Sequence, residues 1–142
     1  MTPEQKTIVQ ETWTQIAPIA GKAAQLFYGR LFEIDPTTRP LFRFVNMPMQ
    51  HDKLMGTLGT AVGSLDNLEA LLPVVEAMGR RHVAYGVKDS HYDSVGAALL
   101  WTLEQGLGAA WTAEAADAWG TVYAAISAVM RGAAKVEESK VA

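Results

Sequence analysis

Apolar residues recur at intervals of three and four along most of the chain, which is the spacing of one face of a helix. No segment alternates apolar and polar residues in the way that a half-buried strand does. The clearest stripes are Ile8, Val9, Trp13, Ile16 and Ala17; Ala24, Phe27, Tyr28, Leu31 and Phe32; Leu54, Leu58, Ala61, Val62 and Leu65; Leu71, Val75, Met78 and His82; and Trp119, Tyr123, Ile126 and Met130. The pattern therefore predicts an all-α fold.

Helix-starting residues precede several of these stripes. "TPEQ" at residues 2–5 has the form of a capping box with proline at the first helical position. Residues 35–48 contain three prolines, so we expect a short helix and an irregular corner there, followed by a longer helix from about Met49. A further helix is expected from about Ser90, and Thr112 is placed to cap the last one.

Polar segments and glycines indicate where the helices end. "SLDN" at residues 64–67 breaks one helix, Gly86 follows the fourth stripe, and "GLG" at residues 106–108 forms a C-terminal cap. The final stretch, "KVEESKVA", is polar and is expected to fray. Since no internal repeat or linker is visible, the sequence predicts one domain over residues 1–134 and a polar tail over residues 135–142.

The composition narrows the classes of function. The chain has 142 residues and no cysteine, which excludes disulfides, iron–sulfur clusters and covalent haem attachment. Its net charge of −3 and its lack of Lys/Arg runs argue against nucleic-acid binding. No apolar run is long enough to span a bilayer, and "MTPEQKTIVQETW" does not resemble a secretory signal. We therefore expect a soluble cytoplasmic protein.

One histidine, His82, continues an apolar stripe and has no neighbouring residue that could share a metal with it. No His, Cys, Asp or Glu lies three or four positions away on either side. His51 and His91 have the wrong spacing for a zinc site on one helix, and the chain has no GxSxG, P-loop or GxGxxG motif. His82 is therefore either a core histidine bonded to a backbone carbonyl or the single axial ligand of a cofactor that brings its other ligands, as haem does.

Two other polar residues are set into apolar helix faces. Tyr28 lies within the second stripe, and Gln50 stands one turn before Leu54. A buried polar group needs a hydrogen-bond partner, so the two side chains could serve a bound ligand. Alternatively, the Tyr28 hydroxyl reaches the surface and Gln50 is the exposed start of its helix.

Several stretches, in this order and at these spacings, match a known family: "LFYGRLFEIDPTTRPLF", "KLM", "LEALLP", "GRRHVAYGV", "HYDSVGAALL" and "AWGTVY". From Trp13 to about Met130 the chain resembles the globin family, and within it the single-domain bacterial haemoglobins related to flavohaemoglobins and to neuroglobin. The resemblance implies a globin fold, a three-over-three helical sandwich around non-covalently bound haem b.

The resemblance also implies roles for individual residues. His82 would be the proximal ligand of the haem iron, and Phe42 would pack against the haem face. Tyr28 and Gln50 would be the distal pair that contacts a gas ligand. Leu54, one turn after Gln50, would close the distal pocket.

At other positions the match to the family is weaker, or a family residue is absent. Lys53 and Arg81 are candidates for the haem propionates, although solvated side chains would explain both. His51 lies beside the distal position and is not assigned as an iron ligand. Tyr92 matches a proximal tyrosine, but Ala134 stands where flavohaemoglobins have the glutamate that pairs with it. The usual carboxylate support of the proximal imidazole is therefore in question.

The implied function is reversible binding of a diatomic gas (O2, NO or CO), with oxygen storage, delivery or sensing as the main expectation. The alternative is an enzyme that converts NO to nitrate and depends on a separate reductase, since the sequence contains no flavin and NAD reductase region. A third interpretation keeps the helical fold as a sensor or scaffold without haem. The protein is expected to be a monomer or a weak homodimer.

Overall fold

The structure, a computed structural model, describes residues 1–141, and every regular element in that range is helical. This confirms the all-α fold. The α-helices are α1 (Pro3–Ile16), α2 (Ala20–Ile34), α3 (Met47–Gly63), α4 (Leu68–Ala84), α5 (Asp89–Leu107) and α6 (Ala113–Val141). Four short 3-10 helices connect them: η1 (Ala17–Ile19), η2 (Pro36–Phe42), η3 (Leu65–Asn67) and η4 (Gly108–Ala110).

Side-chain caps hold the first and last helices where the sequence predicts their starts. The Thr2 hydroxyl accepts a hydrogen bond from the Gln5 N–H at 3.1 Å, and the Gln5 side chain accepts one from the Thr2 N–H at 2.9 Å. The Thr112 hydroxyl accepts one from the Ala115 N–H at 3.1 Å. The capping box and the cap of the last helix are both confirmed.

The third helix begins slightly before the expected position at Met49. The Asn46 side chain accepts a hydrogen bond from the Met49 N–H at 3.1 Å, which makes Met47 the first helical residue. Pro48 then lies in the first turn, where its missing N–H removes no helical hydrogen bond. The cap therefore places Gln50 at the N-terminal end of α3.

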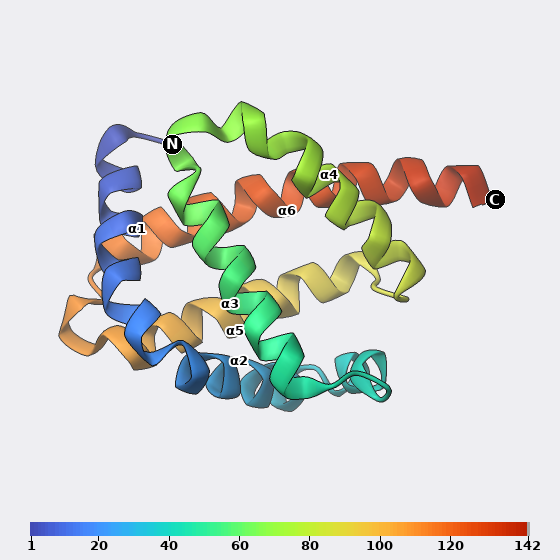
Figure 1. The fold of residues 1–142 in the computed structure, drawn as a ribbon, viewed down its shortest axis with the longest axis horizontal. Coiled ribbons are helices and arrows are strands. Elements are labelled where there is room, and N and C mark those ends of the chain that lie inside the picture. The colour runs from blue at the N-terminus through green and yellow to red at the C-terminus, as the bar shows by residue number, and fades with distance from the viewer. Residues whose placement is uncertain (142) are drawn as a thin grey trace.

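Helices that are far apart in the sequence cross and pack in pairs. α4 packs against α6, α2 against α5 and α1 against α6, and Figure 1 shows α3 and α4 crossing in front of α5 and α6. At Gly79, where α4 meets α6, a Cβ atom would lie only 2.5 Å from the carbonyl oxygen of Met130. A residue without a side chain is needed there, so Gly79 sets how closely these two helices approach.

Two hydrophobic clusters make up the core. In the larger one Trp119 is 1% exposed, and its indole N–H donates to the Thr12 hydroxyl at 2.8 Å. Tyr28 also belongs to this cluster. The smaller one joins residues of α3, α4, α5 and α6: Ala61, Leu71, Val75, Tyr92 and Met130. Tyr28 and Tyr92 are therefore buried in different parts of the core.

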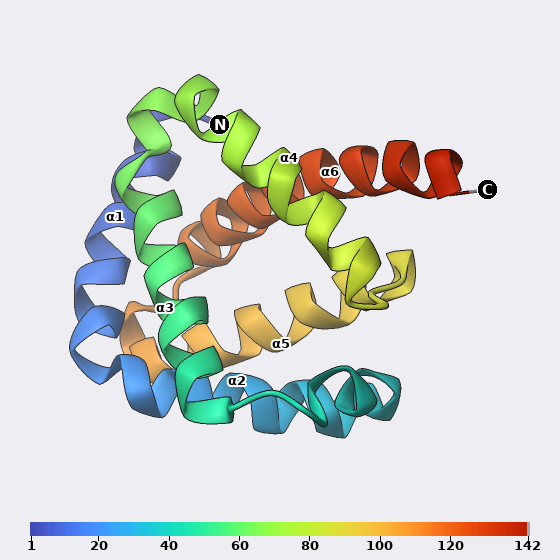
Figure 2. The same ribbon diagram turned by 45° about the vertical axis from the view of Figure 1, so that its right-hand side comes forward.

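The last helix continues through the segment that the sequence predicts to fray. α6 is helical as far as Val141, so the expectation of a frayed tail is wrong over the described residues. The segment after residue 134 contains no Gly or Pro, and half of its residues are the helix formers Lys and Glu. Figure 2 shows its last turns extending past the other helices. The domain boundary at residue 134 stays a prediction.

None of the helices over residues 1–141 is both long enough and apolar enough to cross a membrane.

Candidate functional site

Two polar side chains, 22 positions apart in the sequence, meet between α2 and α3. The Gln50 Nε2 donates a hydrogen bond to the Tyr28 hydroxyl oxygen at 3.0 Å. Tyr28 comes from the buried face of α2 and is only 4% exposed, and Gln50 is half-buried. Gln50 is therefore not simply an exposed helix start, because its amide bonds to the hydroxyl of a buried tyrosine.

Aromatic rings surround the Tyr28 side chain. Phe42, at the end of η2, meets it edge-on with 5.3 Å between ring centroids, and Phe32 lies at 6.1 Å. The His51 imidazole stacks on the same ring at 5.3 Å, with only 12° between the ring planes. The structure thus brings Phe42 together with Tyr28. It also adds His51 as a direct neighbour of Tyr28, a contact for which the sequence carries no local signal.

The Tyr28 hydroxyl is set up as a hydrogen-bond donor. Burial raises the pKa of Tyr28 above its ordinary value, and the hydrogen bond from Gln50 acts in the opposite direction. The hydroxyl therefore keeps its proton at neutral pH. Because its oxygen already accepts from Gln50, the O–H is left to donate to another acceptor.

His82, near the end of α4, hydrogen-bonds to the backbone one turn earlier. Its Nδ1 lies 2.6 Å from the Met78 carbonyl oxygen. Since a carbonyl can only accept, Nδ1 carries the proton and Nε2 keeps a lone pair available for a metal. Burial lowers the pKa of His82; the bond to Met78 raises it, and the nearby Arg81 lowers it. The imidazole is therefore neutral at neutral pH, which is the form that binds metal ions.

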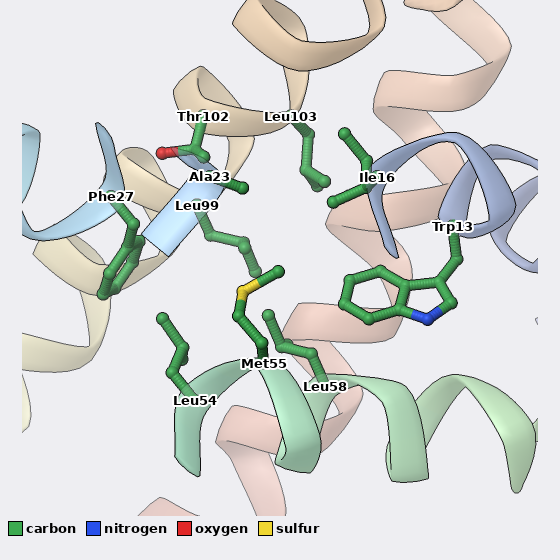
Figure 3. Close-up of a pocket in the computed structure, with 10 residues that line it drawn as sticks. All are labelled: Trp13, Ile16, Ala23, Phe27, Leu54, Met55, Leu58, Leu99, Thr102 and Leu103. Carbon is green, nitrogen blue, oxygen red and sulfur yellow. The ribbon is translucent and has the colours of Figure 1, made fainter. Parts of the chain in front are cut away.

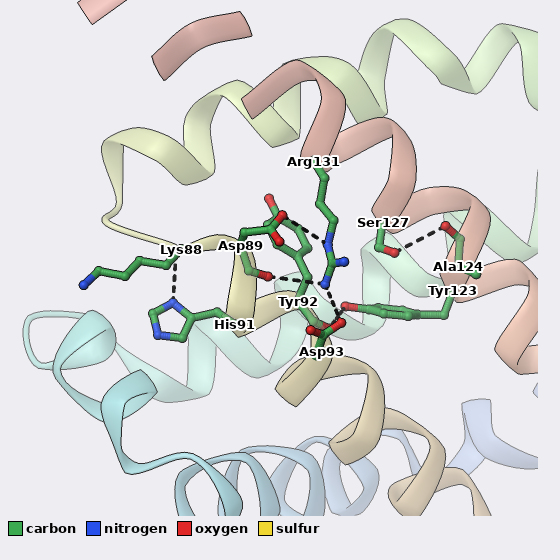
Figure 4. Close-up of polar contacts among 9 residues, drawn as sticks. All are labelled: Lys88, Asp89, His91, Tyr92, Asp93, Tyr123, Ala124, Ser127 and Arg131. Carbon is green, nitrogen blue, oxygen red and sulfur yellow. Dashed lines mark hydrogen bonds and ion pairs between the residues drawn. The ribbon is translucent and has the colours of Figure 1, made fainter. Parts of the chain in front are cut away.

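Two tyrosines lie beside His82. The Tyr85 ring is 5.6 Å away between centroids, and the Tyr92 ring is 6.5 Å away with 27° between the planes. Tyr92 is 6% exposed, and its hydroxyl is buried without a hydrogen-bond partner. Its pKa is raised, chiefly by burial. Figure 4 shows Arg131 of α6 next to this tyrosine. Tyr92 thus lies beside His82, and it faces the imidazole with its ring.

A small cavity of about 10 Å³ adjoins Tyr28 through its neighbour Phe27. Figure 3 shows the side chains that line it: Trp13, Ile16, Ala23, Phe27, Leu54, Met55, Leu58, Leu99, Thr102 and Leu103. The Thr102 hydroxyl donates to the Ala98 carbonyl at 2.8 Å, so the lining is mostly apolar. Leu54, which the resemblance places over the distal pocket, forms part of this wall.

The remaining candidates are surface residues. Lys53 on α3 and Arg81 on α4 are both exposed, so the structure leaves their interpretation as solvated side chains open. Over the described range, no group of three or more His, Cys, Asp or Glu side chains is arranged to hold a metal ion. His82, with its available Nε2, instead fits an iron that already has four ligands from a porphyrin.

Comparisons with known proteins identify the family. The globin family model matches residues 25–130 of the chain. Neuroglobin from Tetraodon nigroviridis is 31% identical over 154 aligned positions, which cover 99% of this chain and 97% of that protein. Neuroglobin from Danio rerio and neuroglobin-1 from Oncorhynchus mykiss are each 30% identical with the same coverage. Together with the helical architecture, these matches show that the chain belongs to the globin family, whose members bind haem iron and diatomic gases.

Proposed function

We propose that this protein binds haem b non-covalently through the Nε2 of His82 and that its function is reversible O2 binding. When bound, haem would supply an iron that can take a diatomic gas. In this proposal Phe42 packs against the haem face and Leu54 closes the distal side. The exposed cations Lys53 and Arg81 pair with the haem propionates.

The hydrogen bond from Gln50 to Tyr28 is the observation that carries this proposal. An O2 ligand carries partial negative charge, so a donor strengthens its binding more than it would for an uncharged ligand. By donating to the Tyr28 oxygen, Gln50 polarises the hydroxyl and makes it a better donor. CO carries much less charge and gains less from the same donor. The pair therefore favours O2 over CO.

The same distal pair supports a relationship with the single-domain bacterial haemoglobins. We propose that the protein acts in the cytoplasm as a monomer or a weak homodimer, and as an oxygen-binding protein for storage, delivery or sensing.

Absorption spectra of the purified protein in its ferric, ferrous and oxygen-exposed forms test the proposal. We expect a haem spectrum that changes reversibly when O2 is added and removed. A colourless protein from cells that contain ample haem would refute haem binding. Sustained NO consumption with a cellular reductant would instead assign NO dioxygenation with a separate reductase.

A further inference from the structure

An arginine of the last helix is tied to the first turns of α5 beside the proximal histidine. The Arg131 Nη2 donates to the Asp93 carboxylate at 2.7 Å and to the Asp89 backbone carbonyl at 3.3 Å. Its Nε lies 3.6 Å from the Asp89 carboxylate. The guanidinium carbon is 5.2 Å from the centroid of the Tyr92 ring (Figure 4), within the range of a cation–π contact. From α6, Arg131 thus anchors both the first turns of α5 and the Tyr92 ring.

None of these contacts gives the Tyr92 hydroxyl a hydrogen-bond acceptor. Its oxygen is buried and unpaired, which is unfavourable for a polar group. Ala134, one turn beyond Met130 on α6, is also buried and offers only a methyl group. Besides burial, the carboxylates of Asp89 and Glu138 raise the pKa of Tyr92 through their charge, but neither makes a hydrogen bond to its hydroxyl.

The same ring lies against His82, at 6.5 Å between centroids. The His82 Nδ1 proton is donated to the Met78 carbonyl, which is a neutral acceptor. A carboxylate connected to this imidazole through a hydrogen bond would make it more basic. The Tyr92 hydroxyl makes no hydrogen bond to His82 or to a carboxylate, so it provides no hydrogen-bonded connection of this kind.

We propose that Arg131 is a positioning residue for the proximal histidine, holding the Tyr92 ring against His82 while its hydroxyl stays unpaired. His82 then meets the iron as a neutral imidazole whose hydrogen bond goes to a backbone carbonyl. This inference rests on the proposed haem ligation by His82. A less electron-rich axial ligand disfavours O–O cleavage and suits reversible gas binding.

Resonance Raman measurement of the Fe–His stretching band in the ferrous protein tests the positioning role, together with the midpoint potential of the iron. Arg131→Gln should shift or broaden the band, because the Tyr92 ring loses its anchor. Arg131→Lys should have a smaller effect, since it keeps the charge but not the planar guanidinium. Arg30→Gln is a matched control: Arg30 pairs with Glu33 at 2.9 Å and lies 5.0 Å from the Trp101 ring centroid, outside the proximal cluster.

A second variant tests the unpaired hydroxyl. Tyr92→Phe should leave the Fe–His frequency unchanged, because the hydroxyl that it removes has no partner.

The outcomes separate this inference from the proposed function. If the wild-type ferrous protein shows no Fe–His band, the haem ligation by His82 is wrong. If the band is present, identical spectra for Arg131→Gln and Arg30→Gln, or a lower frequency in Tyr92→Phe, would overturn the inference alone. If Arg131→Gln fails to retain haem, Arg131→Lys still tests the positioning role, and Tyr92→Phe, which leaves the ion pairs of Arg131 in place, still tests the unpaired hydroxyl.

Discussion

Replacing Tyr28 by phenylalanine should speed the release of O2 from the haem protein. The substitution removes one oxygen atom and keeps the ring, so the contacts of Tyr28 with Phe42 and His51 can be retained. The volume and apolar character of the surroundings change little. What is lost is the hydroxyl donor that Gln50 polarises.

The size of the effect follows from the kind of hydrogen bond that is lost. A hydrogen bond to a charged or partly charged group contributes roughly 1.5–3 kcal/mol. Each ~1.4 kcal/mol corresponds to a tenfold change in a rate or equilibrium constant. The O2 dissociation rate should therefore rise by about one to two orders of magnitude. The CO dissociation rate should change far less, because bound CO carries much less charge.

Stopped-flow measurement of O2 and CO dissociation on wild type and variant provides the test. Thr12→Val is a matched control, since it removes a different buried hydrogen bond, the one from the Trp119 indole at 2.8 Å. Its O2 dissociation rate should stay close to that of the wild type. Gln50→Leu should accelerate O2 release less than Tyr28→Phe, because the hydroxyl remains and loses only the polarisation by the amide.

Equal acceleration of O2 and CO release by Tyr28→Phe would refute this reasoning. It would mean that the variant changes the shape of the pocket and that hydrogen bonding to the ligand is not its main effect.

Three further predictions concern the proximal ligand, the packing and the response to pH. His82→Ala should abolish stable haem retention, and an unchanged ferrous spectrum would mean that another residue binds the iron. Gly79→Ala should lower the free energy of unfolding by about 1–3 kcal/mol, because the new Cβ would lie 2.5 Å from the Met130 carbonyl oxygen. Urea denaturation measures this change, and an unchanged free energy would mean that α4 and α6 can move apart without cost. Hydrogen bonds, the largest effect coming from Thr37, lower the pKa of Asp35 below its ordinary value of 3.8. Its carboxylate therefore stabilises the fold above that pH, and this contribution is lost as the pH falls through the folded-state pKa. The thermal unfolding midpoints of the wild type and of Asp35→Asn should therefore converge as the pH falls. A difference between the midpoints that does not change with pH would contradict this role of the Asp35 carboxylate.

Much of the secondary structure was determined by the sequence itself. The apolar period and the caps at Thr2 and Thr112 act within a few residues, so they can be recognised without knowledge of the fold. The start of α3 lies before the predicted position because Asn46 supplies a cap inside a proline-rich corner. The end of α6 lies beyond the predicted position because a polar composition does not prevent a continuous helix when good helix formers are present.

The sequence also determined which residues could carry chemistry. His82 stood out because it continues an apolar stripe without a neighbouring metal ligand, and Tyr28 and Gln50 stood out as polar residues in apolar faces. Each of these signals is local, since it depends on residue type and on position along one helix. For that reason the sequence left open whether each side chain is buried and which group it meets.

Only the tertiary structure decided how these residues are paired. Gln50 donates to Tyr28 across 22 positions, and Arg131 reaches Asp93 across 38. The stacking of His51 on Tyr28 and the unpaired hydroxyl of Tyr92 likewise depend on how the helices cross. Helix crossings are set by side-chain packing along the whole contact, including the close approach at Gly79, and no local pattern encodes them.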